Sequence, residues 1–416
     1  MQVTTNRYIM MSQDRERIDR AVQASGGKLK IVEDLPVCDG VLIEAAPGYD
    51  PDLFKGKIPG LSVVPERKLH WIEPVAVEAA PKHTMAFDGD KVGAVAGTLH
   101  MDQVWAQGFT GKGVGVAVLD SGIVEHADFD GRLAVFKDFT DPSKDGQPWD
   151  AAGHGSHVAG DAAGSGKSSN GEHRGPAYEA TILGLKVGDQ WGPDESAALK
   201  AVQWAIDHKD EHNIRLMNMS FGGPTQKDPL DDPLVRAVHK AADAGITTFM
   251  AAGNEGPGKS TIGSPGYAPR AITVGASDDR RTASRDDDRL ARFSSRGPTP
   301  DGQQKPDIVS PGVNIVGPDA SSRDRYVSMS GTSMASPVAM GVAATWLQAN
   351  PDLTSEQLKQ IAKESATPLT QPELTPNDQG AGLIDGLKGL EKALALKAAA
   401  AAAGSPAAGA AIALAA

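Results

Sequence analysis

Short apolar segments rich in β-branched residues alternate with helical segments between residues 114 and 363 of this 416-residue chain. The first kind is typical of buried strands, and the second kind carries apolar residues at the spacing of amphipathic helices. Alternation of this sort predicts a mostly parallel sheet, because each crossover helix covers one of its faces. We therefore predict an α/β domain with a doubly wound sheet over residues 96–390. Its strands are 114–119, 181–187, 214–219, 246–251 and 271–274, and its helices are 195–208, 234–244 and 355–363.

Residues 1–74 show a pattern of their own. The order strand, helix, strand, strand, helix, strand is ferredoxin-like, and a last extended segment at 69–72 is expected to close the sheet. The strands are predicted at 7–11, 28–32, 38–45 and 61–65, and the helices at 15–24 and 52–57. We predict that this small α+β unit is followed by a linker at 75–95, which contains Pro and Ala and has no periodicity.

The C-terminal end of the chain, from 391 to 416, is Ala-rich and low in complexity. We predict a frayed helix that passes into a disordered tail. This segment is too short and too weakly apolar for a membrane anchor.

One serine stands at the start of a predicted buried helix. The run Gly-Thr-Ser333-Met-Ala-Ser-Pro leads into the apolar residues 338–347. Free N–H groups and the positive end of the helix dipole gather at such a position, so an oxyanion formed by attack of Ser333 would meet donors there. A helix-capping serine would fit the same run, so the role of Ser333 depends on its partners. Met334 is expected to be exposed in the same cleft and open to oxidation.

Two upstream residues are suited to activate a serine. Asp120 ends the predicted strand 114–119, at the edge where α/β sheets carry their sites. His154 lies between two glycines, which allow the backbone to turn tightly. A nucleophilic serine needs a base, and the base needs a group that orients it. His157 lies one helical turn after His154 and is predicted to pack rather than to bind a metal, because no carboxylate follows in the pattern of a zinc protease.

The segments around Asp120, His154 and Ser333 resemble the three signature blocks of the subtilases, the subtilisin-like serine proteases. A fourth block, Ala-Ala-Gly-Asn254-Glu-Gly, resembles the one whose asparagine contributes to the oxyanion hole of that family. The resemblance runs from about residue 105 to 387 and departs at Ser156, where threonine is usual. It implies a serine endopeptidase with His154 as base, Asp120 as orienting group, and Asn254 and the N–H of Ser333 as oxyanion donors.

The resemblance also implies a set of substrate-binding residues. One strand edge would pair with an extended peptide, and small residues would form the walls and base of a roomy primary pocket. We therefore expect broad specificity, with a preference for large apolar residues before the scissile bond. Asp194 and Glu195 fall near a more distant subsite, where they would attract basic residues. The substrate-binding residues are Ser220, Phe221, Gly222, Ala251, Ala252, Gly253 and Gly263.

The N-terminal unit resembles the inhibitory prodomain of subtilases, which assists folding and then blocks the cleft. This implies a zymogen that cuts itself between about residues 74 and 90, with its own prodomain as an intramolecular inhibitor and with protein or peptide substrates. An unrelated accessory domain is the alternative for this unit. For the whole chain, a processing protease restricted to one substrate and a peptide-binding pseudoenzyme are the alternatives, although none of the four site residues is missing.

Composition bounds the partners. The net charge of −12 and the lack of a basic tract argue against nucleic acid, and the single cysteine, Cys38, excludes an intrachain disulfide. We expect a monomer with no membrane partner. Met1 leads directly into the first predicted strand without an export signal, so we expect a cytoplasmic protein if Met1 is the true start and a secreted one if a signal has been omitted.

Catalysis by a serine, a histidine and an aspartate requires no cofactor, so none is expected. Many subtilases bind structural calcium, and carboxylates are abundant here, for example at 278–279 and 286–288. The loop 164–175, however, lacks the asparagine-rich pattern of the strong calcium site in secreted bacterial subtilisins. Structural calcium is therefore left open, and its ligands are unassigned.

Overall fold

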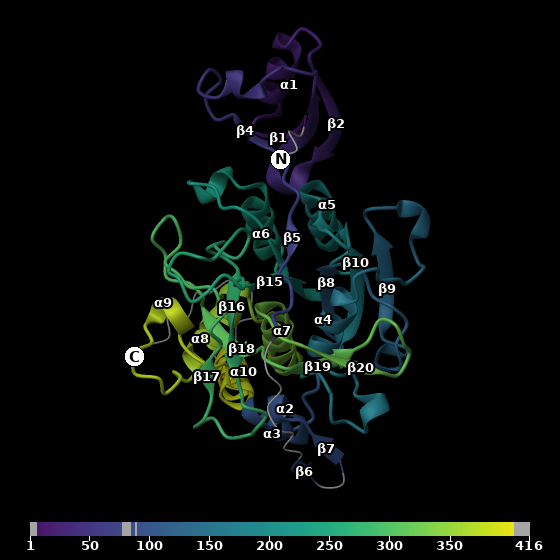
Figure 1. The fold of residues 1–416 in the computed structure, drawn as a ribbon, viewed down its shortest axis with the longest axis vertical. Helices are drawn as coiled ribbons and strands as arrows, with labels where there is room; N and C mark the ends of the chain where they lie inside the picture. Colours follow the sequence, from purple (N-terminus) through teal and green to yellow (C-terminus); the bar gives the residue numbers. More distant parts are fainter. Residues whose placement is uncertain (1–5, 77–84, 88–89, 403–416) are drawn as a thin grey trace.

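The computed structural model describes residues 6–76, 85–87 and 90–402 and contains two units (Figure 1). The smaller, N-terminal unit is an antiparallel sheet in the order β2-β3-β1-β4, covered by helix α1 (Arg15–Ala24). This strand order agrees with the ferredoxin-like prediction, but the predicted helix 52–57 is only a 3-10 turn at Pro51–Phe54. The strands are β1 (Arg7–Met11), β2 (Leu29–Leu35), β3 (Gly40–Ala45) and β4 (Ser62–Pro65).

The segment 69–72 does not close this sheet, so that prediction was wrong. Its strand, β5 (His70–Trp71), pairs antiparallel with β14 (Phe221–Gly222) of the larger unit. Leu69 and Trp71 are buried, as their alternation predicts, but they pack into the core of the larger unit. Alternation of apolar and polar residues indicates that one face of a strand is buried, but it does not indicate which sheet the strand joins.

The larger unit has a sheet in the order β17-β16-β15-β13-β8-β10-β9, with β18 beside β16. All of its pairings are parallel except the one between β16 and β17, as expected for a doubly wound sheet. Its strands are β8 (Gly115–Asp120), β9 (Leu133–Asp138), β10 (Thr181–Lys186), β13 (Ile214–Met219), β15 (Thr247–Ala251), β16 (Ile272–Asp278), β17 (Arg289–Leu290) and β18 (Ile308–Pro311).

Alternate residues of the central strands point to two different cores. In β8, Val116 and Val118 pack on the side of α4 (His154–Ala163) and α7 (Thr332–Ala349), whereas Ala117 and Leu119 pack on the other side. The second side is covered by α5 (Glu195–Asp207) and α6 (Pro233–Asp243). Because both faces are covered, every residue of β8 is buried.

The two units meet where the N-terminal sheet sits over α5 and α6 (Figure 1). Val37 and Cys38, from a 3-10 turn, are buried in the core that these helices share with the large sheet. Burial raises the pKa of the Cys38 thiol to about 12, so this thiol is held in its unreactive form. Lys240 of α6 donates to the carbonyl of Pro36 at 2.6 Å and to Asp39 at 2.5 Å.

The C-terminal region is more ordered than predicted. Helix α10 (Gly386–Ala402) packs on α7 and on α8 (Ser355–Ser365), with Leu390 and Ala393 buried. The indole N–H of Trp346 donates to the carbonyl of Gly386 at 2.9 Å. The predicted disorder is therefore wrong for residues 391–402, because an Ala-rich helix can be held by tertiary packing; residues 403–416 lie outside the described part. Among the described residues, no helix has both the length and the apolar character needed to cross a membrane.

Candidate active site

Three elements bring Asp120, His154 and Ser333 together at the carboxyl edge of the parallel sheet. Asp120 is the last residue of β8, His154 is the first residue of α4, and Ser333 is the second residue of α7. Each side chain therefore leaves its element at a terminus that faces the same edge. The sequence prediction placed all three at these positions.

Asp120 and His154 form a buried pair. Nδ1 of His154 lies 2.7 Å from Oδ1 of Asp120, and the two residues are only 4% and 1% exposed. The N–H of Ser121 donates to the same carboxylate oxygen at 2.7 Å. The contact between His154 and Asp120 fixes the imidazole so that Nε2 is the nitrogen available for proton transfer. Within the described part of the chain, Nε2 makes no hydrogen bond of its own.

The charge around His154 favours the imidazolium. Burial alone would lower the pKa of His154, but the Asp120 carboxylate outweighs burial and the net shift is upward. Asp150 and Glu73 add smaller contributions in the same direction. The site is therefore built to stabilise the positive charge that appears on the base when it accepts a proton.

Asp150, which the sequence analysis did not single out, fixes the start of the histidine helix. One carboxylate oxygen accepts from the hydroxyl of Ser121 at 2.7 Å and from the N–H of Gly153 at 2.9 Å. The other accepts from the N–H and the hydroxyl of Ser156, at 2.9 and 2.8 Å. The small hydroxyl at Ser156, where threonine is usual, thus serves to anchor α4. The carboxylate also satisfies N–H groups that a helix start would otherwise leave unpaired.

Asn254 is oriented by the loop before the serine. Its Oδ1 accepts from the N–H and the hydroxyl of Thr332 at 3.0 and 3.1 Å, so its amide nitrogen faces the cleft. Pro337 cannot donate to the carbonyl of Ser333 four residues earlier, and the hydroxyl of Ser220 donates to that carbonyl at 3.1 Å. The nucleophile is thereby tied to the strand edge that carries Ser220.

The chain itself occupies this cleft as an extended peptide. The N–H of Ile72 donates to the carbonyl of Ser220 at 3.3 Å and continues the pairing of β5 with β14. The hydroxyl of Ser333 donates to the carbonyl of Ile72 at 2.9 Å. Nδ2 of Asn254 donates to the next carbonyl, that of Glu73, at 2.8 Å. The peptide bond between Ile72 and Glu73 therefore lies between the hydroxyl of Ser333 and the amide of Asn254.

Trp71 covers the imidazole. Its ring stacks on that of His154 with a centroid separation of 5.8 Å, and its indole N–H donates to the carbonyl of Asp189 at 2.7 Å. The residue next to Ile72 thus shields the base from water while the segment is bound. Met334 is also fully buried, so the expected exposure of this methionine is wrong: as the third residue of α7 it points into the core.

A cavity of about 210 Å³ is lined by most of the predicted pocket residues. Ile72, whose carbonyl accepts from the hydroxyl of Ser333, also lines it, together with Phe221 and Gly222 of the predicted edge. Glu255 and Thr261 also line this cavity and were missed, because neither residue belongs to a run that sequence spacing singles out. The predicted residues in its wall are Phe221, Gly222, Ala251, Ala252, Gly253 and Gly263.

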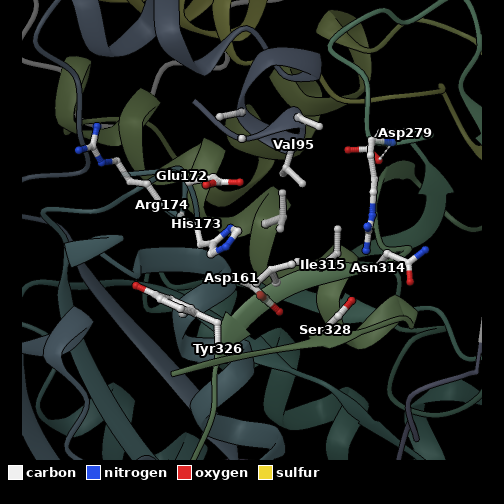
Figure 2. A pocket seen from close by; sticks show the side chains of 18 of the residues that line it. Val95, Asp161, Glu172, His173, Arg174, Asp279, Asn314, Ile315, Tyr326 and Ser328 are labelled. Atoms are coloured by element: carbon white, nitrogen blue, oxygen red, sulfur yellow. Dashed lines mark hydrogen bonds between the residues drawn. The ribbon is translucent and has the colours of Figure 1, made fainter. Parts of the chain in front are cut away.

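A larger cavity, of about 350 Å³, lies elsewhere, and none of the four catalytic candidates lines it. Figure 2 shows Asp161 and Tyr326 on one side of this cavity and Asp279 on the other. Asp161 holds the ring of His157 with Nδ1 at 2.9 Å, and the Nε2 of that ring lies 3.1 Å from the carbonyl of Val327. His157 is therefore a buried, hydrogen-bonded residue, as predicted.

Two of the acidic residues considered for calcium have side-chain partners within the protein. Asp278 contacts Arg280 at 3.3 Å, and Asp287 accepts from Thr282 at 3.0 Å. Burial raises the pKa of Asp279 to about 6. Burial and the nearby charge of Asp279 raise the pKa of Asp288 to about 7. Within residues 6–76, 85–87 and 90–402, no group of three or more His, Cys, Asp or Glu is placed to hold a metal ion. Asp288 is fully buried, and neither of its carboxylate oxygens has a hydrogen-bond partner among the described residues. No calcium ligands are assigned.

Comparison with known proteins supports the geometry. A model of the subtilase family matches residues 111–382. Serine protease AprX of Bacillus subtilis (strain 168) is 46% identical over 297 residues, which are 67% of this chain and 66% of AprX. Subtilisin E of the same organism is 35% identical over 268 residues, covering 63% of this chain and 62% of subtilisin E.

Among solved structures, fervidolysin from Fervidobacterium pennivorans, a keratinolytic enzyme related to subtilisin, is similar with a TM-score of 0.70. The match covers 93% of this chain and 61% of fervidolysin at 24% identity, so it supports the fold alone. The matches span less than two thirds of the length of each of these three relatives.

A parallel α/β sheet with aspartate, histidine and serine at its carboxyl edge, in that chain order, defines a class of serine hydrolase sites. With the family match over residues 111–382, the chain belongs to the subtilase family.

Proposed function

We propose that this chain is a serine endopeptidase made as a self-processing zymogen. The observation that carries the proposal is the position of its own peptide bond, with the hydroxyl of Ser333 at 2.9 Å from the carbonyl of Ile72 and Asn254 on the following carbonyl. A peptide-binding pseudoenzyme would need no base beside the serine, whereas His154 is held by Asp120 in the tautomer that a base requires.

In the proposed reaction, Ser333 Oγ attacks the carbonyl carbon of the scissile bond while Nε2 of His154 takes its proton. The oxyanion is held by Nδ2 of Asn254 and the N–H of Ser333. His154 then gives the proton to the leaving amine, and water hydrolyses the acyl-enzyme by the same steps. Asp120 stays ionised throughout and stabilises the imidazolium. In the structure Asn254 contacts the carbonyl of Glu73, so the Ile72 carbonyl must shift into the oxyanion hole before attack.

We place self-cleavage at the bond between Ile72 and Glu73, just upstream of the range 74–90 expected from composition. Ile72 has the backbone pairing and the pocket of a residue before a scissile bond, and Glu73 follows it past the nucleophile. The composition of the linker favoured a cleavage site further along the chain, because Pro and Ala indicate an irregular segment. A peptide bound for cleavage, however, adopts an extended conformation and pairs with a strand.

The test is to incubate the purified full chain and determine the new termini by mass spectrometry. We expect a C-terminal fragment that begins at Glu73. A fragment beginning between 77 and 90, with no cut after Ile72, would overturn the assigned bond. A chain that stays whole and hydrolyses no peptide would overturn the proposed function itself.

We further propose that large apolar residues are preferred before the scissile bond. Ala251, Ala252 and Gly253 leave room in the primary pocket, and Ile72 of the bound segment lines the same cavity. Profiling with a peptide library should therefore give mainly large aliphatic or aromatic residues at this position. A profile dominated by Lys or Arg would contradict the proposal and would point to Glu255 at the pocket wall. Cleavage of one sequence only would favour a dedicated processing protease.

The partners proposed are protein or peptide substrates and the chain's own N-terminal unit, which acts as the inhibitor. The triad supplies the nucleophile, the base and the orienting group from its own side chains, so the proposed mechanism uses no cofactor. Structural calcium, suggested only by resemblance to other subtilases, is not assigned to any residue.

A further inference from the structure

One residue of the bound segment, Arg67, makes far more contacts than its neighbours. It lies five residues before Ile72 and immediately after the N-terminal sheet, whose last strand ends at Pro65. Its side chain is only 10% exposed and contacts two fully buried carboxylates, those of Glu195 and Asp232. These contacts lie at the end of the cleft away from the triad, and the proposed mechanism does not use them.

The guanidinium of Arg67 has a partner for each of its five N–H groups. Nε donates to Glu195 at 3.1 Å, and one terminal nitrogen donates to Glu195 and, at 2.7 Å, to Asp232. The other terminal nitrogen donates to Asp232 at 3.0 Å and to the carbonyl of Pro224 at 2.7 Å. A lysine ammonium has only three N–H groups, all on a single atom, so it could not reproduce these five hydrogen bonds.

Both carboxylates belong to the catalytic unit, and that of Asp232 is held there independently of Arg67. Glu195 is the first residue of α5, and Asp232 caps α6 by accepting from the N–H of Leu234 at 3.0 Å. The hydroxyl of Tyr267 donates to the other oxygen of Asp232 at 2.9 Å. Both anions thus stand at helix N-termini, where the helix dipole favours negative charge.

Main-chain contacts fix the register of the peptide in this part of the cleft. The N–H of Leu69 donates to the carbonyl of Pro193 at 2.9 Å, and the N–H of Arg67 donates to Glu195 at 3.1 Å. The N–H of Glu195 in turn donates to the carbonyl of Arg67 at 3.1 Å. Any extended peptide can make these contacts, so a substrate bound in the same register places its own side chain between the two carboxylates.

We propose that Glu195 and Asp232 form a subsite that selects arginine at the sixth residue before the scissile bond, in protein substrates as well as in the N-terminal unit. This inference rests on the proposed endopeptidase function. It sharpens the expectation of a basic preference near Asp194 and Glu195. Asp194 is half-exposed and contacts Lys68 at 3.3 Å, and a surface ion pair of this kind contributes little to binding. Asp232 was not predicted from the sequence.

The experiment compares hydrolysis of three peptides by the self-processed enzyme. The first has the sequence of residues 65–76, the second carries citrulline in place of Arg67, and the third carries lysine there. Citrulline keeps the shape of arginine without its charge. We expect kcat/KM for the arginine peptide to exceed that of the citrulline peptide by about 10–100-fold, as for hydrogen bonds between charged groups, with lysine in between. Equal rates for the three peptides would overturn the subsite.

A pair of variants localises the effect. In Glu195→Gln/Asp232→Asn the ratio between the arginine and citrulline peptides should fall to about one. The control is Asp231→Asn, which removes one negative charge from an exposed neighbour of Asp232 and should keep the wild-type ratio. If the double variant does not fold, the wild-type comparison of the three peptides still decides. A short peptide of residues 69–76, which lacks position 67, separates the two proposals. If this peptide is hydrolysed and the three longer peptides show no arginine preference, only the subsite is overturned. If no peptide is hydrolysed, the proposed function is overturned.

Discussion

Replacement of Ser333 by alanine is expected to abolish both self-cleavage and peptide hydrolysis while leaving the fold intact. The hydroxyl is the only proposed nucleophile, and its loss should lower turnover by about 10⁶, the effect that removal of this serine has in subtilisin itself. The fold should survive because, among the described residues, the hydroxyl donates only to the carbonyl of Ile72 and, at 3.4 Å, to the carbonyl of Ser220. The measurement is the mass of the incubated chain together with its circular dichroism and melting temperature.

The control for this variant is the wild-type chain purified and incubated in parallel. We expect the wild type to lose its N-terminal unit, and Ser333→Ala to stay whole with an unchanged or higher melting temperature. A higher value is expected where the inhibitory unit remains attached, because a bound partner stabilises the folded state. Full activity of the alanine variant would show that another residue is the nucleophile.

The second large effect is expected for Asp120→Asn. An amide at this position removes the negative charge beside His154 and can hold the imidazole in the wrong tautomer, so turnover at neutral pH should fall by about 10⁴, as this replacement does in serine proteases. The distance of 2.7 Å between Nδ1 and the carboxylate makes His154 directly sensitive to this change.

The pH profile of this variant tests the cause. The carboxylate of Asp120 raises the pKa of His154 against the effect of burial, and the base works only when the imidazole is neutral. With the carboxylate gone, the pKa of His154 should fall, and the acid limb of kcat/KM should move to lower pH. A limb that stays in place while activity drops would show that Asp120 acts through geometry alone. Asp150→Asn is a comparison variant, expected to move the limb in the same direction but less.

The parts of this molecule predicted well from sequence are those encoded locally. Strand 214–219 was predicted with its observed bounds, because a short, mostly apolar segment between two predicted helices is typical of a buried strand in a parallel sheet. Asp120, His154 and Ser333 were found because each stands where an element begins or ends. Asn254 was found from its motif, and the structure adds the reason that it points into the cleft.

The features that sequence reasoning missed depend on contacts between distant segments. The alternation in 69–72 predicts a strand but does not name β14 as its partner. Asp150 and Asp232 look like ordinary surface carboxylates in the sequence, and only the fold shows that both bind helix starts, with Asp232 fully buried and Asp150 partly buried. The Ala-rich stretch after residue 390 is low in complexity, yet it continues α10, which approaches the ring of Trp346 closely at Gly389.

The contact of the N-terminal unit with α5 and α6 has a kinetic consequence. Cutting the bond after Ile72 breaks one covalent link but leaves the contacts of Lys240 with Asp39, of Arg67 with its two carboxylates, and the apolar contacts of Val37 in place. The severed unit is therefore a bound product rather than a released one. Appearance of activity should lag behind the cut and then accelerate, because each enzyme molecule that loses its unit can degrade the units that others release.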